Sequence, residues 1–484
     1  MKEKTAKIII IISLSIAFLL VVSINWLYSN FGHLTLEGIV FHLKVPIEGT
    51  SPDMIWKYLI QCPWKAIVLT IIVSVLLIKR IKEPETSKNI IISVTVALLL
   101  FVASMGHVVI ATDMVGYIYN QTNDSIFIAD EYVDPESINI QFPEQKRNLI
   151  YIFLESMETR FYSAEDGGLS ENDLIPEIST LAKENLNFTD TNKIGGAHTL
   201  PGTTWTIAAM TAQTSGVPLK ISVEDNSLDQ HSIFLGGAYS IGEILENNGY
   251  HNFLLLGSES AFGGRKNLFE QHGNYEIWDF KSAMDEKRIS EKVWWGYSDD
   301  DLFRFAKEKI LKLSEQENPF NFTMLTADTH FPDGYECKDC QNKWDEQYKN
   351  VISCSSKKLG EFISWIKQQD FYENTTIVIS GDHLTMQSNF FESKESQEYE
   401  KKVVNVIINP AVEAENTSRT YSTFDLYPTT LAALGAQIEG DRLALGTNLF
   451  SNEPTLIEKY GLEYVNRELM KTSKFYNNNI LVED

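Results

Sequence analysis

The sequence predicts an α/β protein in which a membrane anchor of three helices precedes a domain with a mostly parallel central sheet. Two observations lead to this fold class. The first 115 residues contain three apolar stretches that are long enough, or nearly so, to span a bilayer. From residue 148 onward, short β-branched runs alternate with longer stretches of helical character. That alternation is typical of a parallel sheet covered by helices on both faces.

The three predicted spans cover about residues 8–28, 64–78 and 90–111. The second is short, but the side chain of Lys65 can snorkel to the interface. Lys and Arg cluster before the first span and between the second and third, whereas the loop 29–63 has only Lys44 and Lys57. The charge bias predicts a multi-pass protein of the cell membrane, with a cytoplasmic N-terminus and an extracytoplasmic remainder. A cleaved signal peptide is the alternative for the first span, but no small-residue cleavage site follows it.

A chain of 484 residues should divide into at least two parts. The net charge of −24 is unevenly distributed, since residues 1–115 carry ten Lys or Arg against seven Asp or Glu. The rest of the chain is therefore strongly acidic, which argues against nucleic acid as a partner. The composition indicates no oligomeric state.

The domain organisation follows from these patterns. Residues 1–115 form the anchor, 116–147 a polar linker that contains Pro135 and Pro143, and 148–484 the extracytoplasmic domain. Strands are predicted over 148–155, 252–257, 275–280, 320–327, 374–380 and 402–409. Helices are predicted over 174–185, 203–214, 238–248, 263–272, 299–316, 344–369 and 423–434.

Three of the four cysteines lie in the outer domain: Cys337, Cys340 and Cys354. The spacing of the first two could suggest zinc or a redox pair, but a zinc site needs a fourth ligand and no thioredoxin-like setting is present. One disulfide is the simplest interpretation for an oxidising compartment. Cys354 could pair with either of the other two.

Polar side chains follow two of the predicted strands. Glu155 closes the run NLIYIFLE, and Asp382 and His383 come directly after the run TTIVISG. Catalytic groups collect at the carboxyl ends of strands in open α/β sheets. Glu155 alone could be an ordinary carboxylate at a strand end, but two adjacent metal-type ligands at a strand terminus have little structural purpose. Together these side chains predict a site for one divalent cation.

A hydroxyl group at a predicted helix start completes this arrangement. Thr203 lies in HTLPGTTWTIAAM, where Pro201 and Gly202 interrupt the chain before an Ala-rich helix. A divalent cation can activate a hydroxyl as a nucleophile, and a helix N-terminus favours an anionic phosphate. Thr at a helix start is often only a cap, and Thr204 and Thr206 are alternatives for the same role. The residues predict a metal-dependent transferase.

Five segments occur in order between residues 148 and 450: NLIYIFLESME, LPGTTWTIAAMTAQTSGVPL, GGRKNLFEQHG, LTADTHFPDG and ISGDHLTM. Together they resemble the phosphoglycerol transferases of the alkaline phosphatase and sulfatase superfamily. The similarity is greatest to enzymes that modify periplasmic glucans, and lipoteichoic acid synthases are more distant. The resemblance implies an alkaline phosphatase/sulfatase-like α/β/α domain. The membrane anchor shares with that family only the general plan of an anchor followed by an outer domain.

The resemblance also implies roles for particular residues. Glu155, Thr203, Asp382 and His383 would bind the metal, with manganese as the expected ion and magnesium as the alternative. Thr203 would also be the catalytic nucleophile.

Two further residues match positions that contact the substrate in the family. Arg265 would hold the phosphoglycerol group, and His330 would face the substrate phosphate or the leaving group as a catalytic residue. In isolation, Arg265 would be a surface charge and His330 a loop residue. Lipoteichoic acid synthases have a tryptophan where this chain has Gly263, so the rim of the pocket should differ.

The implied reaction moves glycerol phosphate from phosphatidylglycerol to a cell-surface or periplasmic glycan through a phospho-threonine-type intermediate. A phosphoethanolamine transferase or a phosphodiesterase of the same superfamily is the alternative, and a non-catalytic glycan-binding scaffold is a more remote one. A sulfatase activity is set aside because LPGTTWT lacks the C/S-x-P-x-R motif. The sequence does not identify the acceptor glycan or any partner protein.

Overall fold

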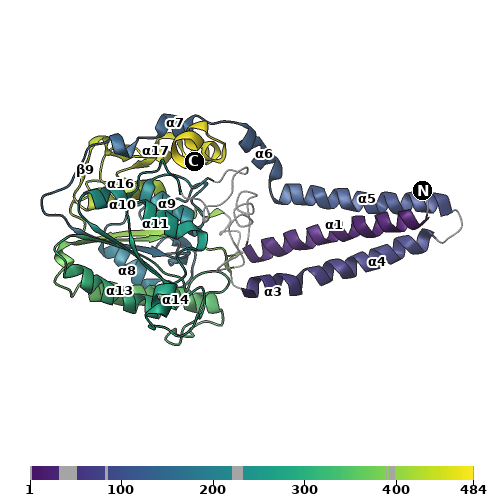
Figure 1. The fold of residues 1–484 in the computed structure, drawn as a ribbon, viewed down its shortest axis with the longest axis horizontal. Coiled ribbons are helices and arrows are strands. Elements are labelled where there is room, and N and C mark those ends of the chain that lie inside the picture. The colour runs from purple at the N-terminus through teal and green to yellow at the C-terminus, as the bar shows by residue number, and fades with distance from the viewer. Residues whose placement is uncertain are drawn as a thin grey trace. The chain divides into compact units, whose positions relative to one another are not determined.

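The computed structural model describes residues 3–31, 52–81, 86–220, 233–387, 390–391 and 398–482 (Figure 1). These residues form two compact units, and the main division between them falls between Thr122 and Asn123. Most of the outer loop predicted over residues 29–63 lies outside the described residues. The two units are described separately below.

The first unit consists of long apolar helices. Three stretches are long and apolar enough to cross a membrane: Glu3–Ser29, Trp56–Ile81 and Ser87–Ala111. They confirm the three predicted helices. The second is longer than predicted, because α3 (Pro52–Gln61) leads almost directly into α4 (Pro63–Ile81).

Helix α1 (Glu3–Phe31) contacts both α4 and α5 (Thr86–Ala111), as Figure 1 shows. The side chains buried between these helices are small or aliphatic: Ala6, Ile10, Leu14, Ile81, Ile90, Val94 and Ala97. Ala6 and Ala97 have no exposed surface, which allows close approach of the helix backbones. Many large apolar side chains point outward instead, as expected of lipid-facing positions.

The second unit is built on a seven-stranded sheet with the order β3-β8-β7-β2-β6-β4-β5. The strands are β2 (Asn148–Leu154), β3 (Gly196–Ala197), β4 (His251–Leu256), β5 (Glu276–Trp278), β6 (Phe320–Leu325), β7 (Thr375–Gly381) and β8 (Val403–Ile408). The five strands from β7 to β5 are parallel, whereas β8 and β3 add to the edge in antiparallel pairs. The prediction of a mostly parallel sheet is therefore confirmed.

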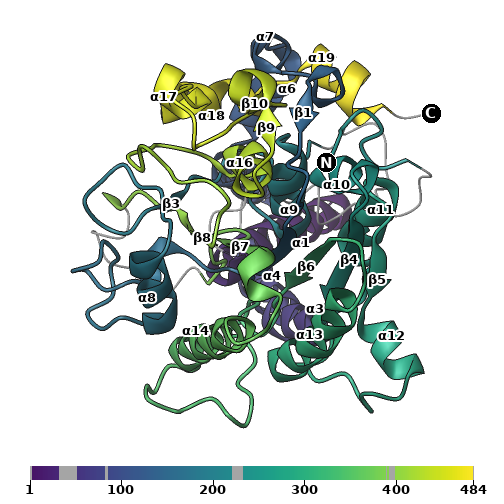
Figure 2. The ribbon, with the colours of Figure 1, turned by 90° about the vertical axis from the view of Figure 1, so that its left-hand side faces the viewer.

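Helices cover both faces of this sheet (Figures 1 and 2). One face carries α8 (Pro176–Glu184), α13 (Asp299–Ser314) and α14 (Gln347–Ile366). The other carries α9 (Thr206–Ser215), α10 (Ile241–Asn247) and α16 (Leu426–Ala433). Because both faces are covered, the central strands are buried along almost their whole length, which explains their continuous apolar runs.

Most of the predicted elements occur with small shifts at their ends. The largest shift that concerns function is in α9, which begins at Thr206 instead of at residue 203. The sequence did not indicate α12 (Phe280–Asp285) or the C-terminal helices α17 (Leu456–Tyr460) and α18 (Leu462–Met470). These helices span at most nine residues, which is too short for periodicity alone to reveal them.

Part of the stretch predicted as a linker packs within the second unit. Helix α7 (Phe127–Glu131) lies next to α18, and β1 (Ile140–Gln141) pairs with β9 (Gln437–Ile438). Glu131 is buried and accepts hydrogen bonds from Lys459 Nζ at 2.8 Å and from the Tyr460 hydroxyl. Burial alone would raise the pKa of Glu131, but the hydrogen bonds from Lys459 and Tyr460 hold it below its ordinary value.

We expect Glu131→Gln to lower the stability of the second unit by about 1–3 kcal/mol, because the charged hydrogen bonds of a buried carboxylate are lost. The pKa of Glu131 is lower in the folded than in the unfolded chain. Its contribution to stability is therefore complete above the unfolded-state pKa and is lost as the pH falls through the folded-state pKa. Thermal melting of the full chain at pH 7 and at pH 4 would measure both effects. Glu463→Gln on the exposed side of α18 is the control. An unchanged melting temperature for Glu131→Gln would contradict a stabilising role of the Glu131 carboxylate.

Candidate metal centre

The two predicted strand ends lie side by side. Strands β2 and β7 are parallel neighbours, with Leu154 opposite Gly381. The next residues are Glu155 and Asp382, and the Asp382 N–H donates to the Leu154 carbonyl at 3.0 Å. The register therefore places both carboxylates at the carboxyl edge of the sheet, at the centre of the second unit.

His383 joins these carboxylates in one buried cluster. Ligand atoms of Glu155, Asp382 and His383 all lie within 4.8 Å of one another. His383 Nε2 is 3.5 Å from Glu155 Oε1 and 3.4 Å from Asp382 Oδ2. None of the three side chains exceeds 3% exposure. The structure thus brings Glu155, Asp382 and His383, all predicted as metal ligands, together.

The chemistry of this cluster fits a divalent cation. Asp382 Oδ1 accepts from the backbone N–H groups of Ser156 at 2.8 Å and His383 at 2.6 Å, whereas Asp382 Oδ2 is buried without a hydrogen-bond partner. His383 Nδ1 lies 2.8 Å from the Leu384 carbonyl, which can only accept, so Nδ1 donates and Nε2 is the ring nitrogen that faces the carboxylates. Carboxylate and imidazole side chains are both ligands of divalent cations in proteins.

The electrostatics of the cluster also favour a bound cation. Burial and the charge of Glu155 raise the pKa of Asp382 to about 8. Burial would lower the pKa of His383, but Asp382 and Glu155 raise it above its ordinary value. Two carboxylates this close in a dry interior repel each other, so a positive charge between them is favourable.

The predicted nucleophile and its neighbour have different surroundings. The Thr203 hydroxyl is buried and bonds to the backbone of Leu200, accepting from its N–H and donating to its carbonyl, both at 2.9 Å. The Thr206 hydroxyl lies 3.5 Å from Glu155 Oε2 and 3.4 Å from His383 Nε2. Thr206 is also the first residue of α9, whose N-terminus favours anions. The Thr206 hydroxyl therefore lies beside the cluster.

Arg265 and His330 also lie near the cluster. Arg265, the first residue of α11 (Arg265–Gln271), is 5% exposed and donates to the carbonyls of Phe262 and Glu259 at 3.0 and 2.8 Å. Burial lowers its pKa to about 10, against the opposing effect of Glu155 and other carboxylates. It therefore stays charged at neutral pH.

The His330 imidazole has a fixed orientation. Its Nδ1 lies 2.8 Å from the Phe331 carbonyl, and its ring packs on Trp295 with 4.4 Å between the ring centroids. Burial lowers the pKa of His330 below its ordinary value, so the ring is neutral at pH 7. Trp295 was not singled out in the sequence, because nothing in the run VWWGYSDD reveals that it packs on a histidine 35 positions later.

Two threonines that the sequence did not indicate connect the site to β6. The Thr326 hydroxyl accepts from the Glu155 N–H at 3.0 Å, and the Thr329 hydroxyl donates to the Glu155 carbonyl at 2.6 Å. Both side chains are buried. They fix the backbone of Glu155 from the neighbouring strand, and so orient its carboxylate.

A second acidic cluster has a different character. Asp190, His198 and Glu400 also offer ligand atoms within 4.8 Å of one another. However, Lys402 Nζ lies 2.8 Å from Asp190 and 3.6 Å from Glu400, so its ammonium already supplies the positive charge. This cluster is an ion-pair network.

A comparison with protein families decides the relationship. The family described as Sulfatase matches residues 147–436, which is more than half of the chain and includes every site residue above. The chain belongs to the sulfatase family. The resemblance inferred from the five segments is thereby confirmed at the level of the superfamily.

Curated relatives of this sulfatase-family chain carry a more specific name. Proteins called phosphoglycerol transferase I from Escherichia coli and Shigella boydii are 32% identical to it over 321 residues. The match covers 64% of this chain and 40% of each relative, so the chain spans less than half the length of those proteins.

Solved structures support the fold. The lipoteichoic acid synthase LtaP from Listeria monocytogenes has a TM-score of 0.53 at 16% identity and covers 75% of this chain and 100% of its own. The integral membrane phosphoethanolamine transferase EptA from Neisseria meningitidis has a TM-score of 0.51 at 11% identity and covers 87% and 83%. At this level of identity, the likeness concerns the fold alone.

We expect a divalent cation, tested as Mn²⁺, to stabilise the second unit, because it would bind the folded site and not the unfolded chain. At a free concentration one hundred times its Kd, the gain is about 2.7 kcal/mol. Thermal melting with EDTA and then with excess Mn²⁺ would measure the shift. The double variant Glu155→Gln/Asp382→Asn should show no shift, whereas Asp190→Asn should behave as the natural chain. An equal Mn²⁺ shift in the double variant would place the cation elsewhere.

Proposed function

We propose that this chain is a metal-dependent transferase that moves glycerol phosphate from phosphatidylglycerol to a hydroxyl group of a cell-surface or periplasmic glycan. The observation that carries the proposal is the buried Glu155–Asp382–His383 cluster beside a threonine hydroxyl at a helix start. Relatives named phosphoglycerol transferase I support the choice of the transferred group. The region that matches the sulfatase family, residues 147–436, includes all of these side chains.

Glu155, Asp382 and His383 would hold the cation, with Mn²⁺ proposed and Mg²⁺ as the alternative. When bound, the cation would lower the cost of ionising the threonine hydroxyl and offset negative charge on the phosphate. The sequence-based prediction names Thr203 as the nucleophile, and the contacts of the described residues favour Thr206. We therefore propose Thr206 for the attack and treat Thr203 as the competing assignment.

In the first step, the threonine oxygen would form a bond to phosphorus, and the phosphorus–oxygen bond to diacylglycerol would break. The guanidinium of Arg265 is charged and near the carboxylates, so it suits an equatorial phosphate oxygen. An anionic phosphodiester would raise the pKa of His330, which allows it to give a proton to the departing diacylglycerol oxygen. In the second step, a glycan hydroxyl would attack phosphorus and release the threonine.

The apolar helices of the first unit fit a lipid donor. Three stretches are long and apolar enough to span a membrane, so the chain would be anchored in the bilayer that contains phosphatidylglycerol. We propose a cytoplasmic N-terminus and an extracytoplasmic second unit, on the basis of the Lys and Arg distribution. Such anchoring raises the effective concentration of the donor at the site.

We expect the purified chain with Mn²⁺ to release diacylglycerol from tail-labelled phosphatidylglycerol and not from phosphatidylethanolamine. Chelation should abolish release, and a soluble glucan acceptor should accelerate it. Thin-layer separation of the labelled lipid would measure the rate. Release from phosphatidylethanolamine instead would assign the chain to the neighbouring class of transferases. Release that depends on water alone would make it a phosphodiesterase.

The two threonines can be separated by substitution. We expect Thr206→Val to lower the rate of diacylglycerol release by at least about 10³-fold, because the attacking oxygen is removed from a nearly isosteric side chain. Thr203→Val should fold less stably but keep most of the activity, since it loses only local bonds to Leu200. Thr204→Val, at an exposed position, is the control. The reverse order of effects would establish Thr203 as the nucleophile.

A further inference from the structure

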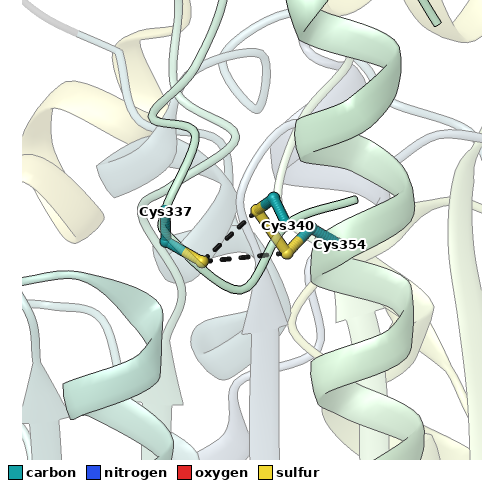
Figure 3. A group of neighbouring side chains, drawn as sticks. All are labelled: Cys337, Cys340 and Cys354. Atoms are coloured by element: carbon teal, nitrogen blue, oxygen red, sulfur yellow. Dashed lines mark hydrogen bonds between the residues drawn. A yellow bond between two sulfur atoms is a disulfide. The ribbon is translucent and has the colours of Figure 1, made fainter. Parts of the chain in front are cut away.

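Three cysteines lie together in the second unit, and none of them takes part in the proposed reaction. Cys340 in the loop after β6 and Cys354 in α14 form a disulfide, which confirms the prediction of one bond that includes Cys354. The Cys337 sulfur lies 3.3 Å from that of Cys340 and 3.9 Å from that of Cys354 (Figure 3). Cys337 is a free thiol and is buried. A thiol is thus held against both sulfurs of an existing disulfide.

The local backbone also favours a different pairing. The Cys340 N–H donates to the Cys337 carbonyl at 3.2 Å, so residues 337–340 form a tight turn that brings the two side chains together. The C-x-x-C spacing is compatible with a disulfide in many proteins. Cys340 therefore has two partners within reach, Cys354 from the helix and Cys337 from its own turn.

We propose that Cys337 is an internal exchange thiol, which converts the Cys340–Cys354 disulfide into a Cys337–Cys340 disulfide. Cys337 loses its proton, and its thiolate attacks the Cys340 sulfur. The Cys337–Cys340 bond forms while the Cys340–Cys354 bond breaks, and Cys354 leaves as a thiolate that takes up a proton. One disulfide and one thiol are present before and after the reaction, so no oxidant or reductant is consumed.

Attack on Cys340 is preferred to attack on Cys354 because that sulfur is nearer. The three sulfurs form a triangle in Figure 3, so the Cys337 side chain must rotate to approach along the line of the existing bond. Its place in a loop allows that rotation, whereas Cys354 is held in α14. The exchange would break the covalent link between the loop and the helix.

The surroundings keep the exchange slow at neutral pH. Burial and a hydrogen bond to the Asp300 carboxylate on α13 raise the pKa of the Cys337 thiol, and Lys358 on α14 opposes them. Tyr335, the other titratable group that interacts with this thiol, also has a raised pKa and stays neutral. Because only the thiolate attacks, the rate should rise about tenfold for each pH unit between 7 and 9.

The consequence concerns the segment next to the metal centre. Lys358, one turn after Cys354 in α14, pairs with Asp328 at 2.9 Å and with Asp300 at 3.2 Å. Asp328 lies two residues before His330. The disulfide, the Lys358–Asp328 ion pair and a hydrogen bond from Gln347 Nε2 to the Gly334 carbonyl at 2.9 Å all fasten the loop segment 328–340 to α14. The exchange would remove the covalent one of these attachments.

The test uses the full chain with Cys62→Ser, so that all thiol chemistry comes from the three outer cysteines. Samples are incubated at pH 7, 8 and 9, quenched with acid, alkylated and digested without reduction. Trypsin cleaves after Lys338, Lys343, Lys349 and Lys357, which places the three cysteines in separate peptides for mass spectrometry. We expect the alkyl group on Cys337 at first and increasingly on Cys354, with the stated pH dependence.

Two variants keep the result interpretable. Cys354→Ser should form the Cys337–Cys340 bond in oxidised glutathione within minutes to hours, and Cys337→Ser should show only Cys340–Cys354 and no label on Cys354. Circular dichroism would confirm that each is folded. The proposal fails if label remains on Cys337 alone at pH 9 and Cys354→Ser keeps two free thiols. It also fails if Cys354 becomes labelled equally in Cys337→Ser.

Discussion

The repulsion between Glu155 and Asp382 is the constraint around which the second unit is organised. Parallel pairing of β2 with β7 puts the two carboxylates at adjacent strand ends, where neither has more than 3% exposure. In such a dry place a pair of like charges is unfavourable unless a cation or a proton compensates. The negative charge is partly offset by backbone N–H groups, by the imidazole of His383 and by the guanidinium of Arg265.

The same constraint explains how an acidic protein would bind the proposed anionic substrate. The chain has a net charge of −24, so a phosphodiester is repelled by most of its surface. At the centre, however, a bound cation, Arg265 and the N-terminus of α9 would offset the charges of Glu155 and Asp382. In a low-dielectric interior, these near groups outweigh the distant and solvent-screened carboxylates.

The sequence was most informative where residues follow a strongly apolar strand. Glu155 and Asp382 could be predicted as neighbours because strand ends are sharp and β2 and β7 are continuous apolar runs. The threonine was less predictable, since three hydroxyls fall within four residues and the start of α9 decides which one faces the cluster. The partner of Cys354 required three-dimensional information, because both candidates lie within one turn. Thr329 and Trp295 act through contacts between distant segments, which no local pattern encodes.

The hydroxyl groups of Thr326 and Thr329 have a consequence for how such proteins diversify. From the start of the segment that follows β6 they bond to the backbone of Glu155, while the Asp382 N–H bonds to the Leu154 carbonyl of the neighbouring strand. The candidate metal ligands are thus held in a frame of hydrogen bonds close to the strand ends. Loops around it can accumulate insertions and substitutions without disturbing that frame. Substitutions in those loops could then change what binds beside the proposed site and leave its metal ligands in place.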